Sequence, residues 1–155
     1  ETLDRNAKSD LCVASLCSGI ALANANLGAV HGFAGPIGGM IDAPHGALCG
    51  SLLLHVCRAN FDTATRRDPD GVVVRKFDEI ALLLTDNPAA KGTYAIAWLD
   101  ALIKDLPLKP ISELGFDSDL IAEATDKASR SSSMKGNPVE LSQADLREIL
   151  QAALI

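Results

Sequence analysis

Basic side chains are in the minority in this chain of 155 residues: 14 Lys and Arg face 20 Asp and Glu, a net charge of −6. A protein that binds nucleic acid needs a basic face for the phosphates, so this balance argues against that class of partner. None of the four cysteines belongs to a C-x-x-C pair, which argues against a zinc knuckle or a thioredoxin-type motif. We expect them to pack as small hydrophobic residues in a reducing, cytoplasmic compartment, with a disulfide or a metal thiolate as the alternatives. They are Cys12, Cys17, Cys49 and Cys57.

Residues 11–57 are almost without charge, because Asp42 is the only Asp, Glu, Lys or Arg among them. This run exceeds the roughly 20 residues that a membrane-spanning helix needs. However, Gly and Ala dominate where Leu and Ile would be expected, and the run is interrupted by Asn24, Asn26, His31 and Pro36. We therefore predict no membrane span and interpret the run as the fully buried central helices of a helical domain.

The first residues, beginning at Glu1, have no signal-peptide layout and no initiator methionine. We interpret the chain as part of a larger protein. Residues 1–155 are expected to form a single domain, because this length suits one hydrophobic core.

The sequence contains no β-strand pattern, in which polar and apolar residues alternate, that is longer than the three residues Val72–Val74. Helical spacing of apolar residues recurs instead, and it predicts an all-α, multi-helix bundle. The predicted helices cover residues 10–26 (capped by Ser9 or Asp10), 44–59, 74–84, 89–105, 118–128 and 143–153. Residues 30–39 are expected to form a shorter piece that is either helical or irregular.

Several local features accompany these helices. Residues 62–70 are polar and predict a turn, and the Ser-rich residues 130–137 predict a mobile loop. The helix over 89–105 is expected to bury Tyr94, Trp98 and Leu102. Ser142-Gln143-Ala144-Asp145 resembles a capping box that opens the last helix.

His31 and His45 stand fourteen positions apart in the uncharged run. Neutral imidazole is the commonest protein ligand of transition metals, so the two side chains are candidate metal ligands. Tight binding of a divalent ion usually needs three protein ligands, and the nearby Asp42 is better explained as a helix cap. The remaining ligands are therefore expected outside this chain. The alternative is two core or capping histidines, and His55 is expected to be structural.

Glycines cluster between the two histidines, at Gly32, Gly35, Gly38 and Gly39. No strand precedes them and no Gly-Lys-Ser/Thr follows, so they form neither a dinucleotide fingerprint nor a P-loop. Their spacing instead gives a face without side chains, which allows a second backbone or a bound cofactor to approach closely.

The residues around both histidines resemble the signature of the iron-containing (group III) alcohol dehydrogenases. The matching segments are Asn26-Leu27-Gly28-Ala29-Val30-His31-Gly32-Phe33-Ala34-Gly35 and Ala43-Pro44-His45-Gly46-Ala47. Weaker likeness continues through the rest of the chain, at Leu52-Leu53-Leu54-His55-Val56, Asn60, Leu114-Gly115 and Asn137-Pro138.

The resemblance implies a two-domain enzyme with an N-terminal α/β domain for the nicotinamide nucleotide. The C-terminal helical domain, of the dehydroquinate-synthase-like type, holds a metal through one Asp and three His. His31 and His45 match the last two of those histidines, and the Asp and first His would precede Glu1. The implied cofactors are Fe²⁺ (or Zn²⁺) and NAD or NADP.

The implied reaction interconverts a small alcohol and an aldehyde or ketone by hydride transfer. Gly35 stands where the family has a further histidine, which places this position near the substrate or the nicotinamide and puts the usual proton route in doubt. We assign no catalytic residue, expect this chain alone to be inactive, and expect it to self-associate as a homodimer through an exposed apolar face. The alternative function is a non-catalytic packing or association module derived from that family.

Overall fold

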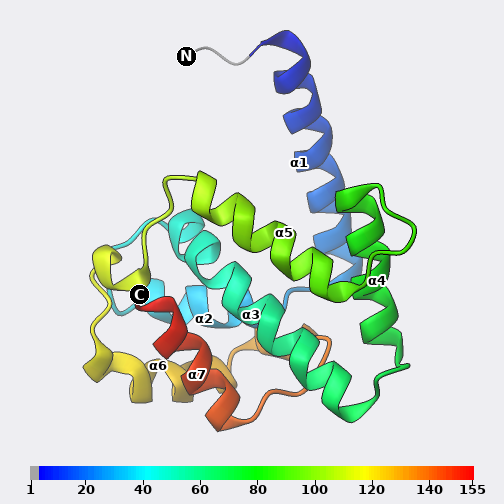
Figure 1. Cartoon of the computed structure of the whole chain (residues 1–155). Helices are drawn as coiled ribbons and strands as arrows, with labels where there is room; N and C mark the ends of the chain where they lie inside the picture. Colours follow the sequence, from blue (N-terminus) through cyan, green and yellow to red (C-terminus); the bar gives the residue numbers. More distant parts are fainter. Residues whose placement is uncertain (1–3) are drawn as a thin grey trace.

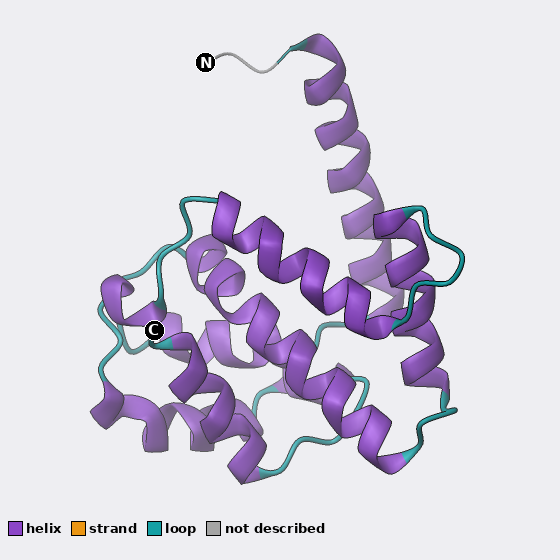
Figure 2. Cartoon of the chain, in the orientation of Figure 1, coloured by secondary structure: helices purple, strands orange, loops and turns teal. Residues whose placement is uncertain are grey.

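The computed structural model describes residues 4–155 and is helical throughout (Figures 1 and 2). Within that range it contains seven α-helices, three short 3₁₀-helices and no strand, which confirms the all-α prediction. The α-helices are α1 (Arg5–Ala25), α2 (Ala29–Gly38), α3 (His45–Arg67), α4 (Val72–Thr85), α5 (Gly92–Asp105), α6 (Ile121–Ser129) and α7 (Gln143–Ala153). The 3₁₀-helices are η1 (Ile111–Leu114), η2 (Ser118–Leu120) and η3 (Ser132–Gly136).

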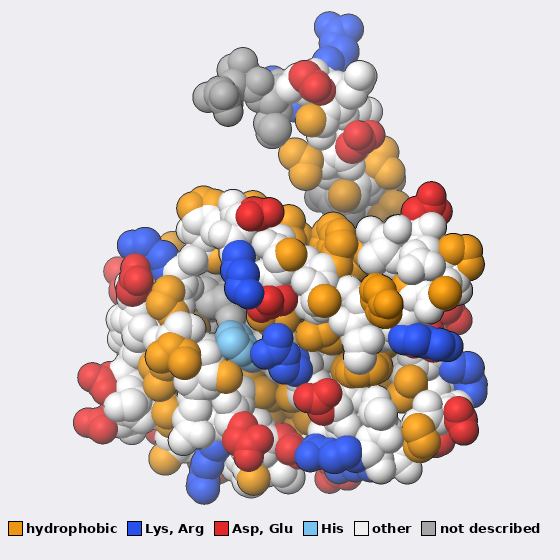
Figure 3. Space-filling view, in the orientation of Figure 1, with side chains coloured by type: hydrophobic (Ala, Val, Ile, Leu, Met, Phe, Trp, Pro, Cys, Tyr) orange, Lys and Arg blue, Asp and Glu red, His pale blue; other side chains and the backbone are white. Residues whose placement is uncertain are grey.

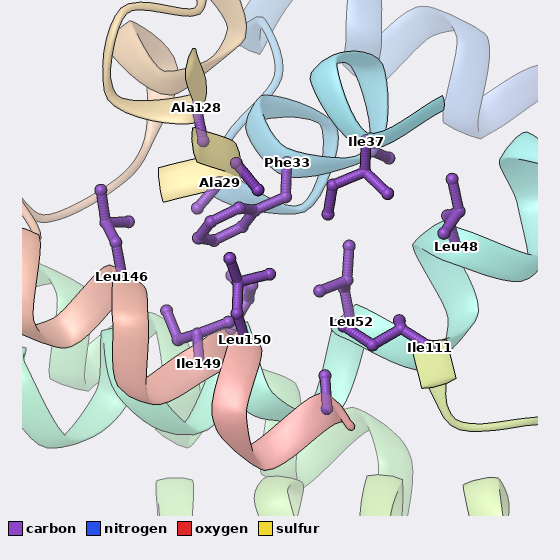
Figure 4. Packing of buried hydrophobic residues seen from close by; sticks show 14 of the residues in the cluster. Ala29, Phe33, Ile37, Leu48, Leu52, Ile111, Ala128, Leu146, Ile149 and Leu150 are labelled. Carbon is purple, nitrogen blue, oxygen red and sulfur yellow. The ribbon is translucent and has the colours of Figure 1, made fainter. Parts of the chain in front are cut away.

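The main core lies between α2, α3, α6 and α7 (Figure 4). Phe33 and Ile37 of α2 are completely buried and point toward the side chains of α7 and α3. Alanines line the facing side of α6, so this helix can pack closely. The cluster also contains Leu48, Leu52, Ile111, Phe116, Ala124, Ala128, Leu146, Ile149, Leu150 and Ala153.

Helices α4 and α5 form a pair that packs on α3 through small residues. The buried cluster here consists of Ala81, Ala90 and Ala95. A Cβ at Gly92 would lie 2.3 Å from the Phe61 ring, so only glycine allows α5 to begin this close to α3. The Asp78 carboxylate of α4 accepts a hydrogen bond from the Gly92 N–H at 2.7 Å and so fixes the start of α5.

Helix α1 differs from the prediction in its start and in its burial. It begins at Arg5, because the Asp4 carboxylate caps it by accepting from the Ala7 N–H at 2.7 Å. It contains no buried residue and projects from the helical body (Figures 1 and 3). The prediction of a fully buried helix was wrong because, among residues 4–155, no other element packs along its length. Its exposed apolar side chains are Leu11, Val13, Leu16, Ile20 and Leu22, and Cys12 and Cys17 are exposed as well.

Helix α3 is longer than predicted and ends at Arg67, so the turn expected over residues 62–70 was wrong for its first part. Asp62 lies on the exposed face of the helix, while Thr63 and Ala64 face the core. The helix stops because Pro69 disfavours the helical conformation in the residue before it, and Asp68 accordingly has non-helical backbone angles (φ −154°, ψ 88°).

Two further expectations were wrong. Tyr94, Trp98 and Leu102 of α5 are 52%, 38% and 36% exposed, because this helix packs through glycine and alanine instead. Residues 132–136 form η3, and the loop prediction missed this ordered turn because Ser-rich sequence gives no helical signal.

Among the described residues, no single helix is long and apolar enough to cross a membrane. Helices α1 and α2 reach that threshold only when taken together, and the chain bends by 98° between them.

The last helix, α7, starts with the predicted capping box. Ser142 Oγ accepts a hydrogen bond from the Asp145 N–H at 3.1 Å, and the Asp145 carboxylate accepts from the Ser142 N–H at 2.7 Å. Hydrogen bonding to the Ser142 side chain is the main reason that the pKa of Asp145 lies below its usual value. Leu146, Ile149 and Leu150 are buried, as predicted.

We expect Ser142→Ala to lower the free energy of unfolding by about 1 kcal/mol at neutral pH, the usual cost of losing an N-cap. Because the folded-state pKa of Asp145 is lowered, its contribution is present above the unfolded pKa of about 3.9 and is lost as the pH falls through the folded value. Urea unfolding at pH 7 and at acidic pH measures both effects. Ser9→Ala, on the exposed α1, is the control, and equal loss in the two variants at pH 7 would contradict the prediction.

Candidate metal centre

His31 and His45 come together in the structure although they belong to different helices. His31 lies in the first turn of α2 and His45 is the first residue of α3. Their ring centroids are 5.3 Å apart and the rings are tilted by 50°. His31 is half-buried and His45 is exposed, so this imidazole pair is reachable from solvent.

The connection between α2 and α3 is a tight six-residue turn that positions both rings. The Ile41 N–H donates to the Ile37 carbonyl at 2.9 Å, which closes the end of α2. Pro44 then precedes α3, and its carbonyl accepts from the Leu48 N–H at 3.1 Å. Asp42 is exposed and does not cap α3, so the prediction of a capping role was wrong; proline itself, with its fixed φ, sets the helix start.

The start of α2 is fixed by Asn137, a residue 108 positions away. No side chain within α2 or at its N-cap, Gly28, satisfies the first backbone donors. The Asn137 side-chain oxygen does so by accepting from the Ala29 N–H at 3.0 Å. Its side-chain nitrogen donates to the Asn60 side-chain oxygen at 2.7 Å and to the Val139 carbonyl at 2.8 Å. Asn137 therefore joins α2 to α3 and fixes the position from which His31 extends.

Cys49 is a third potential metal donor beside the two histidines. The potential metal-ligating atoms of His31, His45 and Cys49 all lie within 4.8 Å of one another. Among residues 4–155, no other group of three or more His, Cys, Asp or Glu side chains converges in this way. Cys49 Sγ lies 3.5 Å from His45 Nε2. The thiol is half-buried, and this burial raises its pKa. The sequence prediction treated Cys49 mainly as a small hydrophobic residue and did not connect it with the histidines.

The glycines between the histidines play different roles. A Cβ at Gly32 would lie 2.9 Å from the Met134 side chain, so this glycine allows η3 to pack on α2. Gly35 lies one turn after His31 on α2 and is exposed, and a Cβ there would meet no atom within 4 Å. The space beside His31 that a larger side chain would fill is therefore open.

His55 lies on α3 away from the metal-donor group. It is half-buried, and desolvation together with the neighbouring Arg58 lowers its pKa, while Asp100 opposes that shift. Cys57 of the same helix is also half-buried and, like the other three cysteines, is a free thiol. Both residues lie on the same helix as His45 and Cys49 but outside the metal-donor group.

Comparison with known proteins places the chain in one family. A family model described as "Fe-containing alcohol dehydrogenase family, C-terminal" matches residues 1–154. Lactaldehyde reductase from Escherichia coli (strain K12) is 28% identical over 97% of this chain and 38% of its own length. 1,3-Propanediol dehydrogenase from Klebsiella pneumoniae is 30% identical over 95% of this chain and 37% of its own.

A solved structure agrees with these relatives. The crystal structure of a 1,3-propanediol oxidoreductase superposes with a TM-score of 0.77 at 30% identity, over 90% of this chain and 36% of that one. The chain thus spans less than two fifths of the length of these two curated relatives. By sequence and by fold, it belongs to the iron-containing alcohol dehydrogenase family and corresponds to the C-terminal helical domain of those enzymes.

Proposed function

We propose that His31 and His45 hold a divalent metal ion in the C-terminal domain of an NAD(P)-dependent alcohol dehydrogenase. The observation that supports this is the convergence of two imidazoles from separate helices, with ring centroids 5.3 Å apart. Family membership implies a metal and a nicotinamide cofactor in the intact enzyme.

The donors suit such an ion. Imidazole nitrogen binds Fe²⁺ and Zn²⁺, and neither histidine forms an ion pair with a carboxylate in the described chain. A bound ion supplies Lewis-acid polarisation of an alcohol or carbonyl oxygen, and the nicotinamide carries the hydride. The chain itself provides a half-buried His31 anchored on α2 and an exposed His45 that faces it.

Gly35 contributes open space beside His31. We propose that the substrate or the nicotinamide ring occupies that space, because no atom of residues 4–155 beyond the adjoining helix backbone lies within 4 Å of a Cβ placed at Gly35. A histidine at this position would instead place an imidazole one turn from His31. Proton transfer in this protein then depends on water or on another group.

The proposed substrate is a small alcohol and the corresponding aldehyde or ketone. Relatives at 28% and 30% identity are a lactaldehyde reductase and a 1,3-propanediol dehydrogenase, both named for small hydroxylated compounds. Because the chain matches 38% or less of their length, we place the nucleotide-binding part and the rest of the active site in the remainder of the intact enzyme.

The decisive experiment measures Zn²⁺ and Fe²⁺ affinity of this chain by competition with a chromophoric chelator. We expect His31→Ala and His45→Ala each to weaken binding by at least about 100-fold, since loss of even an outer-shell partner of a ligand costs 10–100-fold. His55→Ala is the matched control and should retain the parent affinity. Unchanged affinity in either His31→Ala or His45→Ala would refute the proposed site.

A further inference from the structure

We propose that the Cys49 thiolate is a third metal ligand, so that this chain alone presents a His₂Cys site suited to Zn²⁺. This proposal rests on the proposed function because it takes His31 and His45 as ligands. It adds a sulfur donor, and this donor gives the site a preference for one metal over another that two imidazoles alone do not give.

The helix brings Cys49 and His45 together. They are four residues apart on α3, and residues at this spacing lie on the same face of a helix, one turn from each other. Cys49 Sγ and His45 Nε2 are 3.5 Å apart. A tetrahedral zinc site with bonds of about 2.1 Å to nitrogen and about 2.3 Å to sulfur separates these two donors by about 3.5 Å. The pair already has the spacing that one shared ion requires.

His31 approaches the same point from α2. Its donor atom lies within 4.8 Å of those of His45 and Cys49, so the three define a triangle small enough for one ion. Because His45 is exposed, its ring can rotate and tighten the triangle without disturbing the core. His31 and Cys49 are half-buried, which limits the movement of the other two donors.

The donor set selects the class of metal. Thiolate sulfur favours Zn²⁺ over harder ions, whereas imidazole alone accommodates Zn²⁺ and Fe²⁺ alike. Zinc is almost always four-coordinate in structural sites, so the three donors of this chain alone leave one tetrahedral position open. Cys49 therefore shifts the site toward zinc and leaves room for a further ligand.

Other cysteines do not share this arrangement. Cys57, two turns farther along α3 and also half-buried, is not part of the metal-donor group, and Cys12 and Cys17 lie on the exposed α1. Cys57→Ser is accordingly a matched control for Cys49→Ser, because the same change is made on the same helix.

The test is a Co²⁺ titration of this chain followed by absorption spectroscopy, together with Zn²⁺ and Fe²⁺ affinities by chelator competition. We expect the parent chain to show a near-ultraviolet charge-transfer band from thiolate to Co²⁺. Cys49→Ser should lose the band and bind Zn²⁺ at least about 100-fold more weakly, with a smaller loss for Fe²⁺. Cys57→Ser should behave like the parent.

The outcomes separate this proposal from the one on which it rests. If the parent shows no thiolate band while His31→Ala and His45→Ala still lose metal, Cys49 is not a ligand and the histidine site stands. If the histidine variants keep full affinity, the proposed function fails and the His₂Cys site fails with it. Absence of the band in the parent refutes a sulfur ligand whether or not Cys49→Ser folds. A band in the parent is assigned to Cys49 when Cys57→Ser retains it and Cys49→Ser, with an unchanged far-ultraviolet circular dichroism spectrum, loses it.

Discussion

Leu52→Ala is expected to lower the free energy of unfolding by about 2–5 kcal/mol, a large share of the 5–15 kcal/mol typical of a folded domain. Leu52 is fully buried in the middle of α3 and lies between Ile37 of α2 and Ile111 (Figure 4). Removing most of its side chain takes away buried apolar area and leaves a cavity that α2 and α3 cannot close without moving together.

Such a movement would reach the proposed metal centre, because α2 and α3 carry its candidate donors. We therefore expect Leu52→Ala to weaken metal binding as well as to lower the urea midpoint. Leu83→Ala is the matched control, because Leu83 is the same residue type on a helix but is 82% exposed. Its change should stay within about 0.5 kcal/mol. Equal destabilisation by the two substitutions would show that the α2–α3 contact does not dominate stability.

Local sequence signals predicted the parts of the fold that depend on local chemistry. The capping box at Ser142 and the buried face of α7 follow from residues three or four positions apart, and both are confirmed. The start of α3 was also predicted to within one residue, because Pro44 is its N-cap and His45 its first residue. Its end was not, because the polar Asp62 looked like a turn signal although the interruption comes only at Pro69.

Tertiary context determined what the sequence did not predict. Residues 11–25 of α1 carry no charge, which indicates that their side chains would be stable in an apolar environment, but this does not provide a surface to bury them. Trp98 likewise has the character of a core residue, yet α5 packs through Gly92 and Ala95, and the indole remains 38% exposed.

The same division applies to the candidate site. The pairing of His31 with His45 was predicted from their shared uncharged segment and from the resemblance to the family, and the structure brings their rings together. Cys49 could have been added from the four-residue spacing to His45 on a predicted helix, but free cysteine is usually a packing residue. The role of Asn137 in fixing the start of α2 could not have been predicted in this way, since its hydrogen bond with Ala29 spans 108 positions and leaves no local pattern.

Asn137→Ala is expected to lower the free energy of unfolding by about 2–4 kcal/mol, because it leaves several polar groups without partners. The substitution removes the acceptor for the Ala29 N–H and both side-chain contacts with Asn60, which is 6% exposed. Asn6→Ala, on the exposed α1, is the matched control and should change stability by no more than about 0.5 kcal/mol.

A double-mutant cycle separates the network from a general packing loss. If Asn60 and Asn137 act as one unit, Asn60→Ala made in the Asn137→Ala background should cost much less than Asn60→Ala alone. Because Asn137 fixes the first turn of α2, the same variant should bind Zn²⁺ more weakly although it leaves every proposed ligand in place. Additive stability effects with unchanged Zn²⁺ affinity would mean that the start of α2 is held by core packing, and that Asn137 does not position His31.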